Sequence, residues 1–102
     1  MLHIEIEPVW RFHKEGSPQT AVVMLGILNQ IRETGKLTSA AEHAHLSYRH
    51  VWNLVEQWSA FFGVPLVETH RGKGTTLTAF GEKLVWAGQR MQARLGPQLE
   101  NL

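Results

Sequence analysis

Two helix starts lie close together between positions 36 and 63, and their spacing restricts the folds open to this chain more than any other feature. Thr38 can cap a short helix over 39–44, and Ser47 can cap a longer one over 48–62. A capping hydroxyl accepts a hydrogen bond from an amide of the first turn that would otherwise have no partner. Because the connection is short, the second helix must turn sharply away from the first.

Small side chains allow these two predicted helices to cross closely. The first carries three alanines, at Ala40, Ala41 and Ala44. The second has an apolar face with helical spacing, formed by Val51, Leu54, Val55 and Trp58. A short helix, a tight turn and a longer amphipathic helix are typical of a helix-turn-helix.

Polar side chains gather at the start of the longer helix, mostly off its apolar face. A helix that enters a DNA groove presents its side chains there. We therefore predict DNA contacts from Ser47, Tyr48, Arg49, His50 and Asn53. Arg49 could bind a guanine edge or a phosphate, and Asn53 could bind adenine or face solvent. Trp52, in the same turns, is expected to pack at the edge of the core.

A glycine-rich hairpin is predicted directly after this helix. Residues 66–70 and 75–78 are expected to be strands joined by a tight tip over 71–74. Glycines on both sides of Lys73 let the backbone approach a phosphate or enter a minor groove. Arg71 adds a second cation, so both side chains are predicted to contact DNA.

The chain before the helix-turn-helix is predicted to form one strand and one helix. Alternating apolar residues over 2–12 indicate a strand, which Pro8 confines to a sheet edge. Ser17 and Pro18 suit a helix start. An amide in the first turn of a helix has no partner within the helix, so nothing is lost when proline, which has no amide hydrogen, stands there. That helix is expected to end at about Thr34. Its predicted buried side chains are Ala21, Met24, Leu25, Leu28 and Ile31.

The last predicted helix is longer than a core of this size needs. Thr78 can cap it, and Gly96 and Pro97 are expected to end it, since the residue before proline avoids helical angles. An apolar stripe with alternating spacings of three and four suits a partner helix. We therefore predict a homodimer interface at Phe80, Leu84, Ala87, Met91 and Leu95.

Composition argues against several classes of protein. With 102 residues, 43% of them hydrophobic, the chain can bury one compact core. It has no cysteine, no His-Glu-x-x-His pattern and no catalytic serine elbow, so no metal, cofactor or enzyme activity is predicted. The formal net charge of +1 leaves room for a local basic face. The longest apolar run, 21–28, is too short to cross a bilayer, and a cytoplasmic protein is expected.

Several motifs together resemble the winged helix-turn-helix domain of bacterial regulators in the LysR and ModE families. The motifs in LysR order are Leu37-Thr38-x-Ala40-Ala41-Glu42, Leu46-Ser47, Leu54-Val55-x-x-Trp58, the run from Phe62 to Glu68, and Leu77-Thr78-x-x-Gly81. Two further motifs are closer to ModE: Ser47-Tyr48-Arg49 followed by Trp52, and Gly72-Lys73-Gly74. The resemblance covers roughly residues 18 to 90. It implies that any effector would bind a further domain, absent from this sequence, that is molybdate-binding in ModE and periplasmic-binding-protein-like in LysR regulators.

The expected fold is mainly α-helical with a small β component, a winged helix-turn-helix. The expected divisions are a DNA-binding domain over 1–78, with a strand at 2–12, the helix-turn-helix at 36–63 and the wing at 64–78, and a linker or dimerisation helix and tail over 79–102. The predicted function is sequence-specific DNA binding by a homodimeric transcriptional regulator, with the helix Ser47–Phe62 in the major groove. The alternative is a winged-helix protein-interaction module that does not bind DNA.

Overall fold

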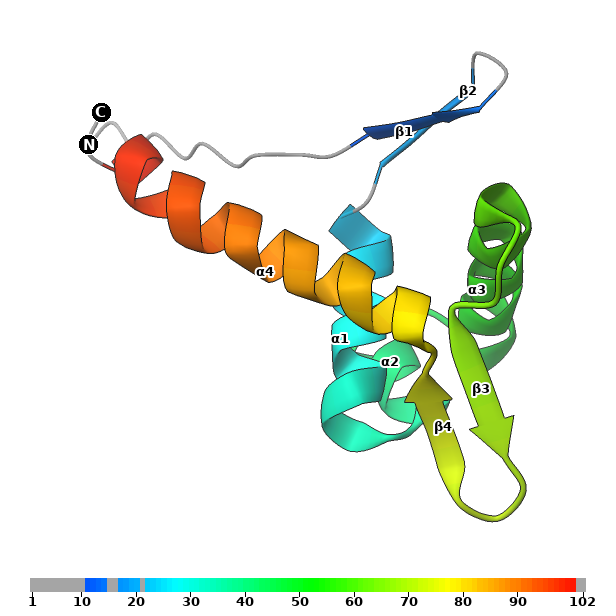
Figure 1. Ribbon diagram of the computed structural model, residues 1–102. Coiled ribbons are helices and arrows are strands. Elements are labelled where there is room, and N and C mark those ends of the chain that lie inside the picture. Colours follow the sequence, from blue (N-terminus) through cyan, green and yellow to red (C-terminus); the bar gives the residue numbers. More distant parts are fainter. Residues whose placement is uncertain (1–10, 15–16, 21, 101–102) are drawn as a thin grey trace.

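A computed structural model describes residues 11–14, 17–20 and 22–100. Its elements in order are β1 (Arg11–Lys14), β2 (Ser17–Thr20), α1 (Val22–Thr34), α2 (Leu37–Ala44), α3 (Tyr48–Phe62), β3 (Val67–His70), β4 (Gly74–Leu77) and α4 (Ala79–Glu100). In Figure 1, α1, α2 and α3 form the body, the β3–β4 hairpin projects from one end, and α4 runs away past the opposite side. The predicted winged helix-turn-helix is confirmed.

The core lies where α1, α2, α3 and the first turns of α4 meet. Its members are Met24, Ile27, Leu28, Ile31, Leu37, Ala40, Ala41, Val51, Val55, Trp58, Leu66, Leu84 and Val85. Burial of each large apolar side chain contributes about 1.5–3 kcal/mol to stability, so a shift of the helices that carry them would cost free energy. Ala40 is fully buried, which agrees with the predicted close crossing of α2 and α3.

The first helix is largely as predicted from its apolar spacing. Met24, Leu28 and Ile31 are buried, Leu25 is half-buried, and Ala21 lies outside the described residues. Ile27, which the sequence analysis omitted, is also buried. The helix ends at Thr34.

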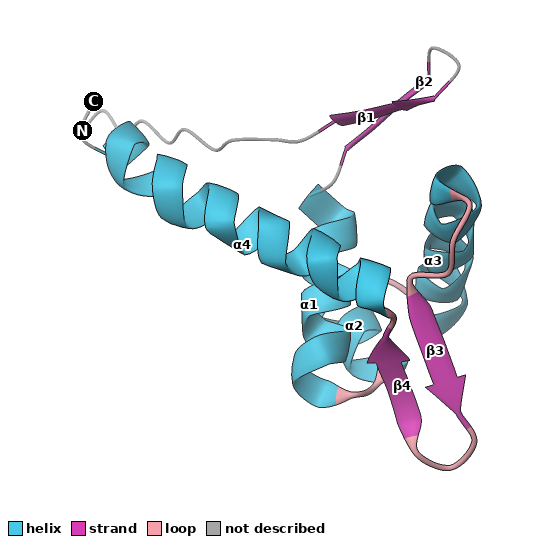
Figure 2. Ribbon diagram, in the orientation of Figure 1, coloured by secondary structure: helices cyan, strands magenta, loops and turns pink. Residues whose placement is uncertain are grey.

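The start of α1 was wrongly placed at Ser17 and Pro18. These residues instead belong to β2, which pairs antiparallel with β1 so that Lys14 faces Ser17 and His13 faces Pro18. A two-stranded sheet consists of edge strands only, so the missing amide of Pro18 need not remove a ladder hydrogen bond. Figure 2 shows this hairpin beyond the start of α1. Of the strand predicted over 2–12, residues 2–10 lie outside the described part of the chain.

The start of α2 also differs from the prediction, because Thr38 is not its cap. The helix begins at Leu37, and the capping position is Lys36, in an extended conformation without a side-chain hydrogen bond to the helix. The side chain of Leu37 is only 4% exposed, so its burial explains why the helix starts before Thr38. The hydroxyl of Thr34 accepts a hydrogen bond from the Lys36 amide at 3.2 Å and steadies this turn.

The last helix begins as predicted but does not end as predicted. The hydroxyl of Thr78 accepts a hydrogen bond from the amide of Gly81 at 3.2 Å and caps α4. At the other end, Pro97 lies inside the helix, which continues to Glu100. The residue before a proline avoids helical angles partly because its Cβ meets the proline ring. Gly96 has no Cβ, which removes that part of the conflict.

Candidate nucleic-acid interface

The predicted cap at the start of α3 is confirmed. Ser47 has extended backbone angles (φ −71°, ψ 156°), and its hydroxyl accepts a hydrogen bond from the amide of His50 at 3.1 Å. The four predicted contact residues that follow it are all exposed: Tyr48, Arg49, His50 and Asn53. A helix start also carries partial positive charge from its aligned peptide dipoles, which favours a nearby phosphate.

Burial of the opposite face decides where these polar side chains point. Val51 and Val55 are completely buried and Trp58 is 7% exposed, so α3 is held against the body along its apolar face. With 3.6 residues per turn, Arg49 and Asn53 lie on the side of the helix opposite to Val51. They therefore face away from the core, on a helix that the core keeps in place.

The wing is a short antiparallel hairpin with a cationic tip. In its register Val67 faces Leu77 and His70 faces Gly74, and the amide of Lys73 donates to the carbonyl of His70 at 2.8 Å. The imidazole of His70 and the hydroxyl of Thr76 form a cross-strand hydrogen bond at 2.8 Å. The side chains of Arg71 and Lys73 at the tip are exposed.

Hydrogen bonds attach the wing to both neighbouring parts of the body. The amide of Thr75 donates to the carbonyl of Gly35 at 2.9 Å, and Thr75 itself is only 6% exposed. At the base of the hairpin, the amide of Leu66 donates to the hydroxyl of Ser59 on α3 at 3.2 Å. The hairpin is thereby fixed relative to α3, which is required if both are to meet one duplex.

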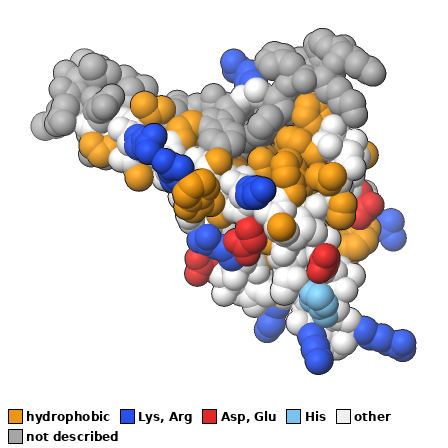
Figure 3. All heavy atoms as spheres, in the orientation of Figure 1, with side chains coloured by type: hydrophobic (Ala, Val, Ile, Leu, Met, Phe, Trp, Pro, Cys, Tyr) orange, Lys and Arg blue, Asp and Glu red, His pale blue; other side chains and the backbone are white. Residues whose placement is uncertain are grey.

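The tip of the wing lies at one end of the molecule, where positively charged side chains gather. Lysine and arginine side chains project from the end where the β3–β4 tip lies, as Figure 3 shows. A DNA contact of this kind needs a polar helix start and a cationic hairpin. Both are exposed here, and the hydrogen bond between Ser59 and Leu66 joins the two elements.

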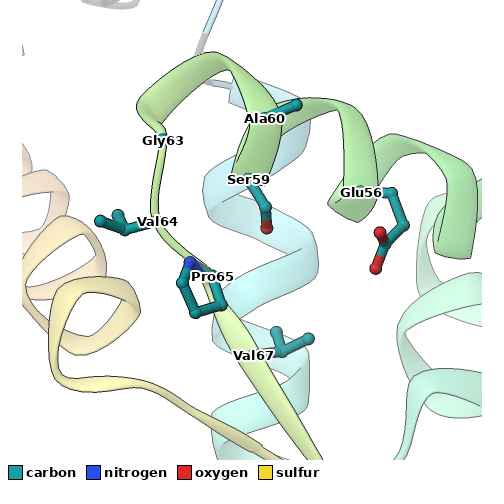
Figure 4. A pocket seen from close by; sticks show the side chains of 7 residues that line it. All are labelled: Glu56, Ser59, Ala60, Gly63, Val64, Pro65 and Val67. Atoms are coloured by element: carbon teal, nitrogen blue, oxygen red, sulfur yellow. The ribbon is translucent and has the colours of Figure 1, made fainter.

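Glu56 on α3 has a position that the sequence analysis did not consider. It is exposed and borders an open groove between the end of α3 and the segment leading into β3. In Figure 4, Glu56 and Ser59 project from the helix on the side of Pro65 and Val67. A carboxylate repels phosphate, so its presence further along the helix favours backbone contacts near the start of α3. The helical repeat would have revealed this position, because Glu56 lies about two turns after Arg49 and so on the same side of α3.

The predicted dimer stripe on α4 is divided between the domain's own core and its surface. Leu84 is 8% exposed, and Phe80 packs against the core with its ring in edge contact with Phe62. Leu84 is thus covered within one chain, and Phe80 is partly covered. Leu95 is 39% exposed, and Ala87 and Met91 are half-buried, so an interface with a partner would have to use this later part of α4.

Two further features of the described residues concern alternative functions. Among residues 11–14, 17–20 and 22–100, no group of three or more His, Cys, Asp or Glu side chains is arranged to hold a metal ion. In the same part of the chain, no helix has the length and apolarity needed to span a membrane.

Comparisons with known proteins point to one family. Residues 23–82, more than half of the chain, match the bacterial regulatory helix-turn-helix proteins of the lysR family. The chain is also 32% identical over 63 residues to the transcriptional regulator ModE of Haemophilus influenzae, covering 58% of this chain and 25% of ModE. The present chain thus spans about a quarter of the length of that relative.

Solved structures agree with this assignment. The chain is similar to CbnR, a LysR family transcriptional regulator, with 25% identity and a TM-score of 0.60, covering 76% of this chain and 26% of that one. It is similar to the protein in the CbnR_DBD–DNA complex, with 25% identity and a TM-score of 0.61, covering 76% of this chain and 87% of that one. The chain therefore belongs to the LysR family of bacterial regulatory helix-turn-helix proteins.

Proposed function

We propose that this domain binds a specific DNA sequence by placing the start of α3 in the major groove and the wing tip on the neighbouring backbone or minor groove. The observation that carries the proposal is the exposed polar start of α3 on a helix whose opposite face is buried. Family membership supports the same conclusion, that of a DNA-binding transcriptional regulator. A bacterial regulator of this kind works in the cytoplasm, where we place the protein.

Each exposed side chain has a proposed role that follows from its chemistry. Arg49 can bind the O6 and N7 atoms of guanine with two hydrogen bonds, and Asn53 can bind adenine. His50 and the capped helix start can bind a phosphate, and the hydroxyl of Ser47 can contact one as well. Arg71 and Lys73 lie at the wing tip and supply charge to the backbone or the minor groove.

Salt dependence tests this function against the protein-interaction alternative. If Arg71 and Lys73 each neutralise a phosphate in both protomers of a dimer, the logarithm of affinity should fall with the logarithm of salt with a slope of about −4. Fluorescence anisotropy of a labelled duplex, measured at several salt concentrations, gives this slope. Lack of duplex binding at low salt would favour the protein-interaction alternative.

We also propose that the later part of α4, at Ala87, Met91 and Leu95, joins two chains into a homodimer. The support is the apolar stripe there, of which Leu95 is 39% exposed in one chain. Residues 79–102 would then act as a linker and dimerisation helix. A twofold dimer would require a roughly palindromic operator with half-sites one helical turn, or a multiple of it, apart.

Leu95→Glu should shift a dimer toward monomer, because it places a carboxylate in the proposed apolar seam without touching the core. The expected weakening of the dimer is about tenfold or more, a cost of at least about 1.4 kcal/mol. Sedimentation equilibrium measures the change. Gln92→Glu, which adds the same charge at a nearby exposed position off the stripe, is the matched control. Equal dimerisation of wild type and Leu95→Glu would exclude this seam.

A further inference from the structure

An open hollow lies at the start of α3, and the described residues that border it are Tyr48, Arg49 and Trp52. Trp52 lies four positions after Tyr48 and three after Arg49, so its side chain is a neighbour of both over the first turns of the helix. The hollow is on the part of the helix that the proposed function places in the major groove. What it can bind therefore bears on which base sequence the domain prefers.

Two of the described residues that border the hollow, Tyr48 and Trp52, are aromatic. Tyr48 is 53% exposed, so its ring is accessible to a ligand. Trp52 is half-buried and packs against the core, as predicted, so the position of its ring is fixed from behind. A hollow with one fixed wall loses little conformational freedom when a ligand group enters it.

The chemistry of the walls selects the group that fits. Phosphates gain charge and hydrogen bonds from Arg49, but nothing from the faces of two aromatic rings. On the floor of the major groove, the one apolar group that base pairs present is the 5-methyl group of thymine. Guanine, which Arg49 can bind, lies on the same floor.

Resting on the proposed function, we infer that the hollow takes the 5-methyl group of a thymine next to the guanine bound by Arg49. Tyr48 and Trp52 then contact the methyl group, while Arg49 binds the neighbouring base. A direct consequence is a preference for a thymine–guanine step, in either order, in each half-site. The deoxyribose of the backbone is the competing apolar group, and the experiment below separates the two.

The test compares thymine with deoxyuridine, which lacks only the methyl group. Duplexes that bind are first selected from a random pool with the wild-type protein. Each thymine of the selected duplex is then replaced singly by deoxyuridine, and affinities are measured by anisotropy. Removal of one methyl group next to the guanine should weaken binding by about fourfold per half-site, the value of one buried methyl group. Other thymines should tolerate the change.

Protein variants show which side chains contact the methyl group. Tyr48→Ala, at an exposed position, should bind more weakly and lose its sensitivity to deoxyuridine at that thymine. Trp52→Leu should behave similarly. Lys73→Ala is the control: it should weaken binding to both duplexes equally and keep the fourfold difference. Circular dichroism verifies that each variant is folded.

The outcomes separate this inference from the proposed function. Tight, salt-dependent binding with full tolerance of deoxyuridine would overturn the inference alone. Sensitivity that persists unchanged in both Tyr48→Ala and Trp52→Leu would also overturn it, because the methyl group would then lie elsewhere. Failure of the wild-type protein to bind any duplex would remove the proposed function, and the inference with it.

Discussion

Replacing Arg49 and Lys73 together by alanine should lower duplex affinity about 100-fold. Loss of a bidentate guanine contact costs about 1–3 kcal/mol, and loss of a phosphate contact weakens binding to all sequences. Both side chains are exposed, so folding should be unaffected. Anisotropy titrations should also show a shallower salt dependence, because each lost phosphate contact reduces the slope by about 1.

The charge-matched control for this double variant is Lys83→Ala with Arg94→Ala. Both residues are exposed on α4, which is part of neither the start of α3 nor the wing. The control removes the same two charges from the chain, so any effect of net charge on long-range attraction would appear in both variants. A loss of affinity as large in the control as in Arg49→Ala with Lys73→Ala would show that the proposed contacts carry no special weight.

Gly74→Ala should destabilise the domain by about 3 kcal/mol, through two effects. Gly74 has a positive φ of 82°, which costs an alanine about 1–2 kcal/mol. In addition, a Cβ atom at this position would collide with the backbone carbonyl oxygen of Gly35, which cannot move aside like a flexible side chain. That carbonyl also accepts the hydrogen bond from Thr75, so the wing would shift. Thermal unfolding should show a Tm about 10–20 °C lower.

Gly72→Ala separates these two effects. Gly72 also has a positive φ, of 72°, but a Cβ atom there would meet nothing within 4 Å. It should therefore cost only about 1–2 kcal/mol, from the backbone conformation. Equal destabilisation by both variants would mean that the close approach of Gly74 to the carbonyl oxygen of Gly35 does not restrict the wing. Because the displaced wing carries Lys73, Gly74→Ala should also lower duplex affinity when measured below its Tm.

Signals confined to a few residues made much of the DNA-binding half predictable. Ser47 was identified as a cap because a serine precedes an amphipathic run, and its hydroxyl accepts the expected hydrogen bond from the first turn. The wing was predictable from its two glycines, Gly72 and Gly74, both of which have positive φ. Arg49, Asn53 and Lys73 followed from these elements, since a helix start and a hairpin tip leave side chains in solvent.

Features that depend on distant parts of the chain were missed or misplaced. Pairing of β2 with β1 overrode the local helix signal of Ser17 and Pro18. Burial of Leu37 moved the start of α2 ahead of Thr38. The turn after α2 was predicted, but its backbone conformation was not, because His45 has φ 57°, a conformation for which glycine is the usual signal.

The role of the apolar stripe on α4 also depends on distant parts of the chain. An apolar stripe indicates that a helix is covered, but the spacing does not reveal what covers it. Leu84 lies in the core of the same chain, whereas Leu95, on the same stripe, lies beyond it. Only the packing of α4 against α1 and β4 distinguishes the two ends.

The central claim is that the start of α3 and the tip of the wing meet one duplex together. The most direct measurement is to record amide chemical shifts of the isotope-labelled protein during titration with a selected duplex. We expect the largest shifts in two separated segments, 47–53 and 71–74, saturating at the same DNA concentration, with the solvent-facing amides of 83–94 little changed. Shifts in only one of these segments, or larger shifts along α4 than in either, would contradict the claim.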